Sequence, residues 1–566
     1  MLRCLFFSFA ALSGAYFIPE IVFQNGGVNG GVASENAECS RIGRNVLLNG
    51  GNAVDSLVAT TFCIGVVAPH HSGIGGGGFA VVRDENGEYE VIDFREAAPA
   101  AASENMYDGN VEGSVTSGLS VAIPGEVRGL EYMHKKYGKL PWEHLVEPAS
   151  EVARYGFKVG HDTIRYMNAV ITKNRNIFLE DPAWAEHFAP NGKLVEVGDI
   201  MYRKNYADTL DKIGKHGADA FYKGEIAESL ISVIQKENGT MTLDDLESYE
   251  VIRREPLEIS YRGYKLYTSG VPSSGAILMS ILKTMEQYPI EDWEDVHLTT
   301  HRFNEAMRFA YGSRLELGDP DFVPESIKIE KAMLDENVAK SIRDRILDDR
   351  TQPIEVYDPR EIYTTEGQGT SHIVTADKDG MATSVTTTIN LLYGSLIMDP
   401  VTGVVLNNEM NDFSIPNVSN EFGFAPSAAN FIRPGKRPLS SITPVIIEIP
   451  ADAESGTPST LYATVGAAGG SRIISATTQV IWHLVEHDFS LPQALAEPRI
   501  HDQLMPNHVL VEYKFDNTTV ESMRQRGHEI VRVAEGLSAV HAVRVEGGVF
   551  EAEAEPRQKD SGGATA

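Results

Sequence analysis

A threonine that directly follows a glycine offers a nucleophile in this chain. Gly369 and Thr370 open a strand-like alternation, the turn 377–380 follows, and a second run ends at Thr388 and Asn390. This pattern predicts two β-strands joined by a tight turn. A Thr hydroxyl fixed beside its own backbone nitrogen can act as a nucleophile if cleavage frees that nitrogen as an amine. An ordinary surface hairpin is the better explanation when these residues are taken alone.

The segment before this pair has the composition of an exposed loop. Residues 351–368 contain Pro353, Pro359, Gly367 and many polar side chains, with little apolar periodicity. We therefore predict an exposed, mobile segment that leads into Gly369, which is where a processing site is expected. Gly369 itself would supply a flexible and unhindered carbonyl group for such a cleavage.

Charged and hydroxyl residues that could hold a substrate lie on both sides of the hairpin. Arg95 stands at the end of a predicted strand, where it is either a surface residue or a bidentate anchor for a carboxylate. Glu409 and Asp412 are three residues apart and could bind an ammonium group, act as acid and base, or cap a helix. Ser440 and Ser441 place two hydroxyl groups close to a cation. Judged singly, each group is better explained by a structural role.

Two glycine-rich stretches lead to different predictions. Residues 73–78 contain the pattern GxGxxG, but a predicted helix precedes it and a predicted strand follows it. A dinucleotide site needs the opposite order, so we reject nucleotide binding and expect close backbone packing. Residues 466–472 precede an apolar helix predicted over 473–485, so the amides of Gly469 and Gly470 would suit an oxyanion.

Composition limits the class of protein and its partners. The chain has 566 residues, is 42% hydrophobic and 23% charged, and is therefore globular and large enough for several folding units. Its net charge of −30 argues against binding to nucleic acid or to anionic membrane surfaces. No group of His, Cys and Asp residues has the sequence spacing of a metal site.

The N-terminus has the pattern of a secretory signal. Residues 1–18 combine Arg3 with an apolar run and then small residues. The run is shorter than the roughly 20 residues that cross a bilayer, so a cleaved signal peptide is favoured over a short anchor. Such a signal predicts a protein that is secreted, faces outward on a membrane, or resides in a vacuole. Three glycosylation sequons fit this route, at Asn238, Asn417 and Asn517.

The cysteines give a further prediction about the compartment. The chain has three, and Cys39 and Cys63 would remain if Cys4 left with the signal. In an oxidising compartment this pair is a candidate disulfide. Two buried free thiols are the alternative.

Taken together, these features resemble the gamma-glutamyltranspeptidase family, also called glutathione hydrolases, which are N-terminal-nucleophile enzymes. The resemblance runs from about residue 31 to residue 560. It is carried by the motifs above and by GGNAVD at 50–55, PHHSGIGGG at 69–77, FRE at 94–96, PGEVRG at 124–129 and LGDP at 317–320. It implies an αββα sandwich of mixed α/β class. A large subunit, 31–369, and a small subunit, 370–566, would build it jointly after the precursor cleaves itself before Thr370.

The resemblance also assigns roles to residues of this chain. Thr370 would be the nucleophile, its freed α-amine the general base, and Thr388 the residue that positions the amine. Gly469 and Gly470 would form the oxyanion hole. The α-carboxylate of the donor would be held by Arg95, Ser440 and Ser441, and its α-ammonium group by Asn390, Glu409 and Asp412. Asn411 stands where an acidic residue is common in the family, which puts only the local charge in doubt.

The implied activity is that of a glutathione hydrolase and gamma-glutamyltransferase. Thr370 would take the γ-glutamyl group of glutathione or a conjugate as an ester, and water, an amino acid or a dipeptide would accept it. No metal or organic cofactor is required. A related acylase for glutaryl or β-lactam amides is one alternative, and the ammonium-binding residues argue against it. A non-catalytic secreted binding protein is the other, and the presence of Thr370 and Arg95 argues against that.

Overall fold

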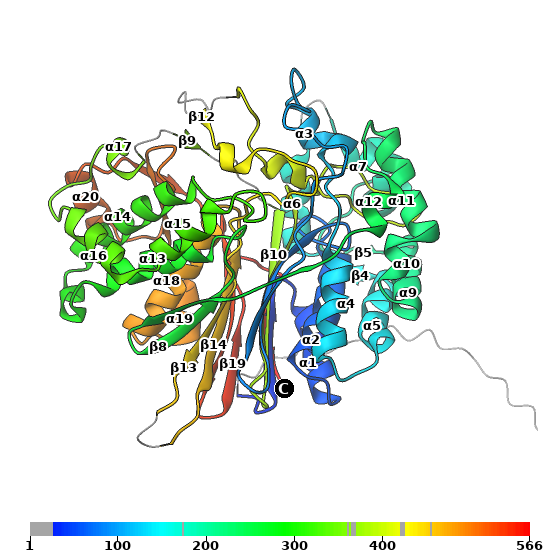
Figure 1. The fold of residues 1–566 in the computed structure, drawn as a ribbon. Coiled ribbons are helices and arrows are strands. Elements are labelled where there is room, and N and C mark those ends of the chain that lie inside the picture. Colours follow the sequence, from blue (N-terminus) through cyan, green and yellow to red (C-terminus); the bar gives the residue numbers. More distant parts are fainter. Residues whose placement is uncertain (1–25, 173–174, 359–361, 364–368, 419–424, 453–455) are drawn as a thin grey trace, which may run out of the picture.

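The molecule consists of two antiparallel sheets packed face to face, with helices covering both outer faces (Figure 1). The computed structural model describes residues 26–172, 175–358, 362–363, 369–418, 425–452 and 456–566. In Figure 1, helices such as α2 and α4 lie on one side of the sheets and helices such as α13 and α18 on the other. This four-layer arrangement confirms the αββα sandwich.

The first sheet has seven strands, with the predicted hairpin near its centre. Their spatial order is β20 (Gly562–Thr565), β1 (Gly30–Ser34), β10 (Gly369–Asp377), β11 (Ala382–Asn390), β2 (Gly77–Arg83), β3 (Tyr89–Asp93) and β6 (Ile252–Arg254). The second sheet has six strands: β19 (Val549–Glu553), β18 (Ala539–Glu546), β14 (Thr460–Ala468), β13 (Val445–Ile449), β8 (Tyr264–Thr268) and β7 (Leu257–Tyr261). Each sheet contains strands from before and after Gly369, so both parts of the chain build one folding unit.

One helical layer covers the first sheet and includes the predicted buried helix. It comprises α1 (Ala37–Leu48), α2 (Ala53–Val67), α4 (Glu126–Tyr137), α5 (Trp142–Tyr155), α6 (His161–Val170), α9 (Lys204–His216) and α11 (Gly224–Lys236). Every residue of α2 is buried. The side chain of Asn52 caps its start and accepts a hydrogen bond from the Asp55 amide. A disulfide between Cys39 and Cys63 joins α1 to α2, as predicted.

The other helical layer covers the second sheet. It comprises α13 (Gly275–Glu286), α14 (Val296–Arg314), α15 (Glu325–Met333), α16 (Glu336–Arg345), α18 (Arg472–Glu486), α19 (Leu491–Ala496) and α20 (Asn517–Gln525). Short helices are α3 (Gly113–Thr116), α7 (Ile177–Glu180), α8 (Pro182–Phe188), α10 (Asp219–Tyr222), α12 (Leu243–Glu247) and α17 (Ile354–Tyr357). Small strands are β4 (Phe157–Lys158), β5 (Ile200–Met201), β9 (Ile362–Tyr363), β12 (Ala425–Pro426), β15 (Ile500–His501), β16 (Val509–Glu512) and β17 (Ile530–Val533).

Side-chain alternation along β10 separates two environments. Ile373 packs in the core beneath α2, whereas Val374 packs between the two sheets. Successive residues of a strand point to opposite faces. Thr370 therefore faces the second sheet, and Ser371 faces the helices.

The segment expected to lead into Gly369 is only partly described. Residues 359–361 and 364–368 lie outside the described residues. Before them, the prediction of an exposed loop is wrong, because α17 forms and Tyr357 is buried in the core. The Tyr357 hydroxyl donates a hydrogen bond to Glu305, 2.5 Å away. The partly buried Ile354 and Val356 of the same helix also pack against the core.

Candidate active site

The Thr370 and Thr388 hydroxyls meet across the central strand pair. Their Oγ1 atoms lie 3.3 Å apart, and both side chains are buried. Thr388 donates its hydroxyl proton to the carbonyl oxygen of Gly369 at 2.6 Å and accepts the Asn390 amide at 2.8 Å. The Thr388 hydroxyl is thus fixed against the peptide bond that joins Gly369 to Thr370.

An irregularity in the strand pairing creates this contact. Gly369 pairs with Asn390 and Thr370 pairs with Thr388, so Ile389 is the extra residue of a β-bulge. Asn390 has a φ of 73°, in the left-handed region that Asn tolerates. A Cβ atom at Gly369 would stand 2.3 Å from the Leu391 carbonyl oxygen. Gly369 is therefore required by close packing, in addition to the flexibility expected from sequence.

The glycine-rich stretch 73–78 supports the same strand from its other edge. A Cβ at Gly76 would stand 2.1 Å from the Thr388 carbonyl oxygen, and one at Gly78 would stand 2.0 Å from that of Thr386. These approaches confirm the predicted use of the glycines in backbone packing.

Arg95 forms a buried ion-pair cluster with two of the predicted ammonium ligands. Its Nη1 atom lies 2.5 Å from Glu409 Oε1, and its Nη2 atom lies 2.7 Å from Asp412 Oδ2. Glu409 is fully buried, whereas 13% of the Asp412 side chain is exposed. Arg95 was assigned to the α-carboxylate of the donor, and Glu409 and Asp412 to its α-ammonium group. In this structure Arg95 pairs with the two acidic residues instead.

Burial dominates the electrostatics of this cluster. It raises the pKa of Glu409 well above its usual range, although Arg95 opposes the shift. Burial likewise raises the pKa of Glu96 to about 7, again against Arg95. Burial lowers the pKa of Arg95, but Glu409, Asp412 and Glu96 outweigh it and the pKa is raised overall. Arg95 therefore stays charged, whereas burial favours the protonated forms of Glu409 and Glu96.

The two serines are held by an arginine that the sequence did not single out. Arg314, the last residue of α14, donates from Nη2 to Ser441 Oγ at 3.0 Å and from Nε to Ser274 Oγ at 3.0 Å. Ser274 in turn donates to the Ser440 carbonyl oxygen at 2.5 Å. Arg314 thus brings a second cation to the side of the site that carries the serine hydroxyls. Only the fold reveals it, because a lone Arg at a helix end has no distinguishing pattern.

The Gly469–Gly470 turn occupies the predicted position between β14 and α18. Both residues have positive φ, 124° and 62°, which favours glycine. A Cβ at Gly469 would stand 2.5 Å from the Leu537 carbonyl oxygen. The turn is followed directly by α18, whose N-terminus gives it a positive electrostatic potential.

One small pocket brings most of the predicted residues together. Its cavity volume is about 20 Å³. Eight of the ten predicted site residues line it: Thr370, Thr388, Arg95, Asn390, Asp412, Ser440, Ser441 and Gly470. Arg314, Leu439, Ile442 and Ile473 complete the lining. Glu409 and Gly469 are not in the lining, but Glu409 contacts Arg95 and Gly469 precedes Gly470.

The pocket around Thr370 is not the largest cavity. A cleft of about 860 Å³ lies beside the hairpin turn, next to Asp377 and Gly380. It contains none of the predicted site residues. Cavity size is therefore a poor guide to the predicted site here.

Comparison with known proteins agrees with this geometry. Residues 39–565 match the family model for gamma-glutamyltranspeptidase. The chain belongs to the gamma-glutamyltranspeptidase family. It is 48% identical over 546 residues to a glutathione hydrolase proenzyme of Arthroderma benhamiae, covering 94% of this chain and 92% of the relative.

Two solved structures have a fold similar to that of this chain. The gamma-glutamyltranspeptidase of Helicobacter pylori matches with a TM-score of 0.53 at 36% identity, covering 56% of this chain and 92% of that chain. A cephalosporin acylase from Bacillus halodurans matches with a TM-score of 0.82 at 24% identity, covering 98% and 99%. The latter match shows a shared fold.

Two predictions about the cellular route are partly addressed. Among the described residues, no helix is both long enough and apolar enough to cross a membrane. The predicted signal, 1–18, lies outside the described residues. Asn238, Asn417 and Asn517 are all exposed, so the acceptor asparagine of each sequon is accessible.

Proposed function

We propose that this chain is the precursor of a glutathione hydrolase and gamma-glutamyltransferase that cleaves itself between Gly369 and Thr370. The observation that carries the proposal is the hydrogen bond from Thr388 to the Gly369 carbonyl, beside the Thr370 hydroxyl. Membership of the family and the high identity to a glutathione hydrolase proenzyme support the activity. Large and small subunits, 31–369 and 370–566, would remain associated because their strands share both sheets.

Self-cleavage would begin with an attack inside the precursor. Thr370 Oγ1 attacks the Gly369 carbonyl carbon, the C–N bond breaks, and the nitrogen takes a proton, which leaves an ester. The α-amine of Thr370 is freed in this step, and water then hydrolyses the ester to give the Gly369 carboxylate and the Thr370 hydroxyl. The Thr388 hydroxyl stabilises the oxyanion because it already donates to that carbonyl oxygen.

Turnover would use the group that cleavage releases. The free α-amine of Thr370 takes the hydroxyl proton as Oγ1 attacks the γ-amide carbonyl of the donor. The amides of Gly469 and Gly470 would hold the oxyanion, and the leaving amine departs with a proton. Water or an acceptor amine then attacks the γ-glutamyl ester and regenerates the threonine.

Donor binding would exchange one set of ion pairs for another. The α-carboxylate of a γ-glutamyl group can replace Asp412 on Arg95 and accept from Ser440 and Ser441. Its α-ammonium group then pairs with the displaced Asp412, together with Glu409 and Asn390. A zwitterionic amino-acid end suits this cluster because it satisfies both signs of charge within one small pocket.

The decisive experiment combines mass with product analysis. The purified protein should appear as two fragments, the smaller beginning at Thr370. It should release glutamate from glutathione and, with a dipeptide acceptor, form the γ-glutamyl dipeptide. An uncleaved chain with full activity would overturn the assignment of Thr370.

An acylase for glutaryl or β-lactam amides is the main alternative. Its donors lack the α-ammonium group, so they would leave Glu409 and Asp412 without a cationic partner from the substrate. We expect a preference for γ-glutamyl over glutaryl anilide of roughly 10⁴-fold, since sites built around polar contacts reject analogues that lack them. Equal turnover of the two anilides would favour the acylase.

We further propose that the protein follows the secretory route. The Cys39–Cys63 disulfide supports an oxidising compartment, and the apolar run in 1–18 supports a signal peptide. N-terminal sequencing of protein from the culture medium of the native host would test this. Exclusive recovery from the cytosol would contradict it.

A further inference from the structure

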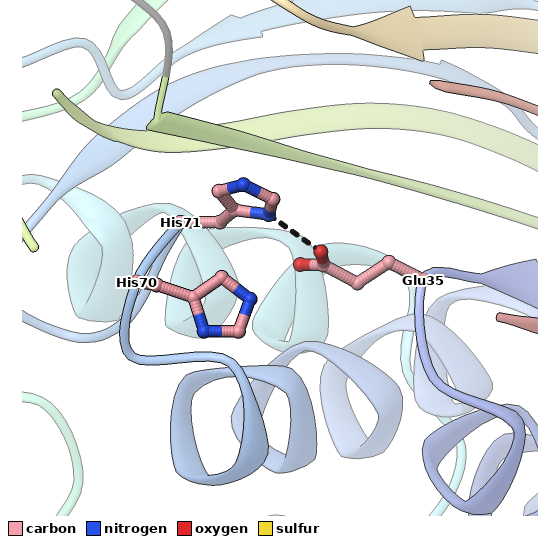
Figure 2. A group of neighbouring side chains, drawn as sticks. All are labelled: Glu35, His70 and His71. Atoms are coloured by element: carbon pink, nitrogen blue, oxygen red, sulfur yellow. Dashed lines mark hydrogen bonds and ion pairs between the residues drawn. The ribbon is translucent and has the colours of Figure 1, made fainter. Parts of the chain in front are cut away.

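A buried cluster of Glu35, His70 and His71 lies behind the nucleophile strand. Glu35 follows β1, and the two histidines lie in the loop after α2. Figure 2 shows the three side chains converging. Each offers a ligand-type nitrogen or oxygen atom, and these atoms all lie within 4.8 Å of one another.

The hydrogen bonds of the cluster leave one imidazole unsatisfied. His71 Nδ1 lies 2.6 Å from Glu35 Oε2, and the Ser371 hydroxyl donates to Glu35 Oε1. His70 Nδ1 is buried and has no hydrogen-bond partner among the described residues. In Figure 2 the other ring nitrogen of His70 faces Glu35. The His70 nitrogen that can bind an ion in this cluster is therefore the one that faces Glu35, and the unpartnered Nδ1 lies on the far side of the ring.

An aromatic side chain covers the cluster from outside. The Tyr166 ring, on α6, stacks on His70 with a centroid separation of 4.9 Å and meets His71 edge-on at 4.3 Å. Tyr166 is partly exposed, whereas both imidazoles are buried. Tyr166 therefore lies between the cluster and the surface.

A second cluster of the same composition provides a contrast. His301 Nδ1 lies 2.8 Å from His528 Nε2, and His301 Nε2 lies 2.8 Å from the Leu347 carbonyl oxygen. Glu305 accepts hydrogen bonds from Tyr357 and Thr351. Each of these side chains already has protein partners, so the second cluster is explained as a structural network.

We propose that Glu35, His70 and His71 form a binding site for a zinc-class divalent metal ion. Two imidazole nitrogens and a carboxylate oxygen are a donor set that Zn²⁺ accepts, with a water molecule at the fourth position. The ion takes the place of the proton between Glu35 and His71. Zinc bonds of about 2.0–2.2 Å in tetrahedral geometry place the ligand atoms roughly 3.3 Å from one another. Glu35 and His71, whose ligand atoms are now 2.6 Å apart, must therefore separate slightly to admit the ion, and the His70 nitrogen must move in to meet it. Ser371 remains bonded to the second Glu35 oxygen and orients the carboxylate.

The first test measures binding to the processed protein. Dialysis against Zn²⁺ and metal analysis should give one tightly bound ion per chain. The double variant His70→Gln/His71→Gln should lose that ion, whereas His301→Gln/His528→Gln should keep it. Loss from the second variant alone, or unchanged binding in both, would overturn the proposal. Neither pair belongs to the proposed catalytic machinery, so failure here would leave the proposed function intact.

A second test uses only the wild-type protein, in case the variants fold poorly. Crystals soaked in Zn²⁺ should show an anomalous difference peak between Glu35 and the two imidazoles. At a free zinc concentration 100-fold above Kd, the unfolding temperature should rise by about 2 °C. A peak only at surface histidines, or no peak, would contradict the proposal.

Discussion

Both faces of the β10–β11 strand pair carry Thr or Ser hydroxyl groups, but one face lines the pocket and the other packs against the helices. Toward the second sheet, Thr370 and Thr388 contact each other and line the pocket. Toward the helices, Ser371 and Thr387 are also directly paired, but each donates its hydroxyl to a buried carboxylate, Glu35 and Glu126 respectively. Alternate residues of a strand point to opposite faces of the sheet, so only the hydroxyls on the pocket face can reach a substrate.

This contrast explains which hydroxyl can become a nucleophile. On the helix face each hydroxyl already donates a hydrogen bond to a buried carboxyl group, and the helices fill the space that a substrate would need. On the pocket face the hydroxyls meet at a scissile peptide bond. The base must then come from the chain end that cleavage creates, which is why the proposed chemistry belongs to the first residue of a new N-terminus.

The largest expected effect separates Thr370 from Ser371. Thr370→Ala should abolish self-cleavage and reduce γ-glutamyl anilide turnover by about 10⁴-fold or more, because the attacking oxygen is removed. Ser371→Ala should still cleave and turn over, although it leaves Glu35 short of a hydrogen-bond donor. Intact mass and initial rates check both variants. A Thr370→Ala chain that matured normally would reverse the roles of the two faces.

Removing the cation of the pocket should have the next largest effect. Arg95→Gln should lower kcat/KM by about 30- to 5,000-fold, which corresponds to roughly 2–5 kcal/mol for one side of a buried charged contact. Self-cleavage should continue, since Arg95 contacts Glu409 and Asp412 but not the scissile bond.

Arg254→Gln is the matched control for Arg95→Gln, because it also removes one ion-paired arginine. Arg254 is also an ion-paired arginine, bound to Asp93 at 2.8 Å, and it does not line the pocket. Its variant should keep kcat/KM within a few-fold of wild type. Equal losses in both variants would show that the effect came from a damaged fold rather than from donor binding.

Thr388→Val tests the hydrogen bond that Thr388 donates to the Gly369 carbonyl oxygen in the precursor. Loss of the donor to the Gly369 carbonyl should slow self-cleavage by about 10²–10³-fold, the usual effect of removing one oxyanion donor. The half-time for conversion of the purified precursor measures this. Thr388→Ser keeps the hydroxyl and should recover most of the rate. Maturation of Thr388→Val at the wild-type rate would exclude Thr388 from the cleavage step.

Local patterns predicted much of this site. The alternation of 371–376 and the turn after it gave the central hairpin, and the glycines before an apolar helix gave the Gly469–Gly470 turn. Such features depend on neighbouring residues, whose preferences are visible in the sequence. The donor set itself came from resemblance, because no spacing rule brings Arg95 to Asp412 across 317 positions.

Contacts between distant segments were missed for the same reason. Arg314 reaches Ser441 from the end of a long helix, and Glu35 meets His70 and His71 only because β1 lies beside the strand that holds Ser371. A search for metal ligands by spacing therefore overlooked them. Residues 354–357 form a short helix that packs on the core although composition assigned them to an exposed loop, because four residues are too few to show a periodic pattern.

The last expected effect is on stability rather than on rate, and it concerns the protonation of Glu126 on the helix face. Burial raises the pKa of Glu126 to about 8 from an ordinary value of 4.5, while the hydrogen bond from Thr387 opposes the shift. Below pH 4.5 both the folded and unfolded states hold the proton. Between pH 4.5 and 8 the unfolded chain releases it and the folded chain keeps it. The stability contributed by this proton is therefore lost as pH rises through that window.

Glu126→Gln should remove this dependence. The free energy of unfolding of the variant, relative to its parent, should rise with pH by about 1.4 kcal/mol per unit between pH 5 and 8. Urea unfolding in the Thr370→Ala background measures it on a chain of constant length. Thr387→Val serves as the comparison: it removes the opposing hydrogen bond and should push the pKa of Glu126 further upward. A stability difference that stayed constant with pH would mean that Glu126 is ionised when folded. The helix face would then hold a carboxylate able to take the proton of Thr387, and the distinction between the two faces would rest on space alone.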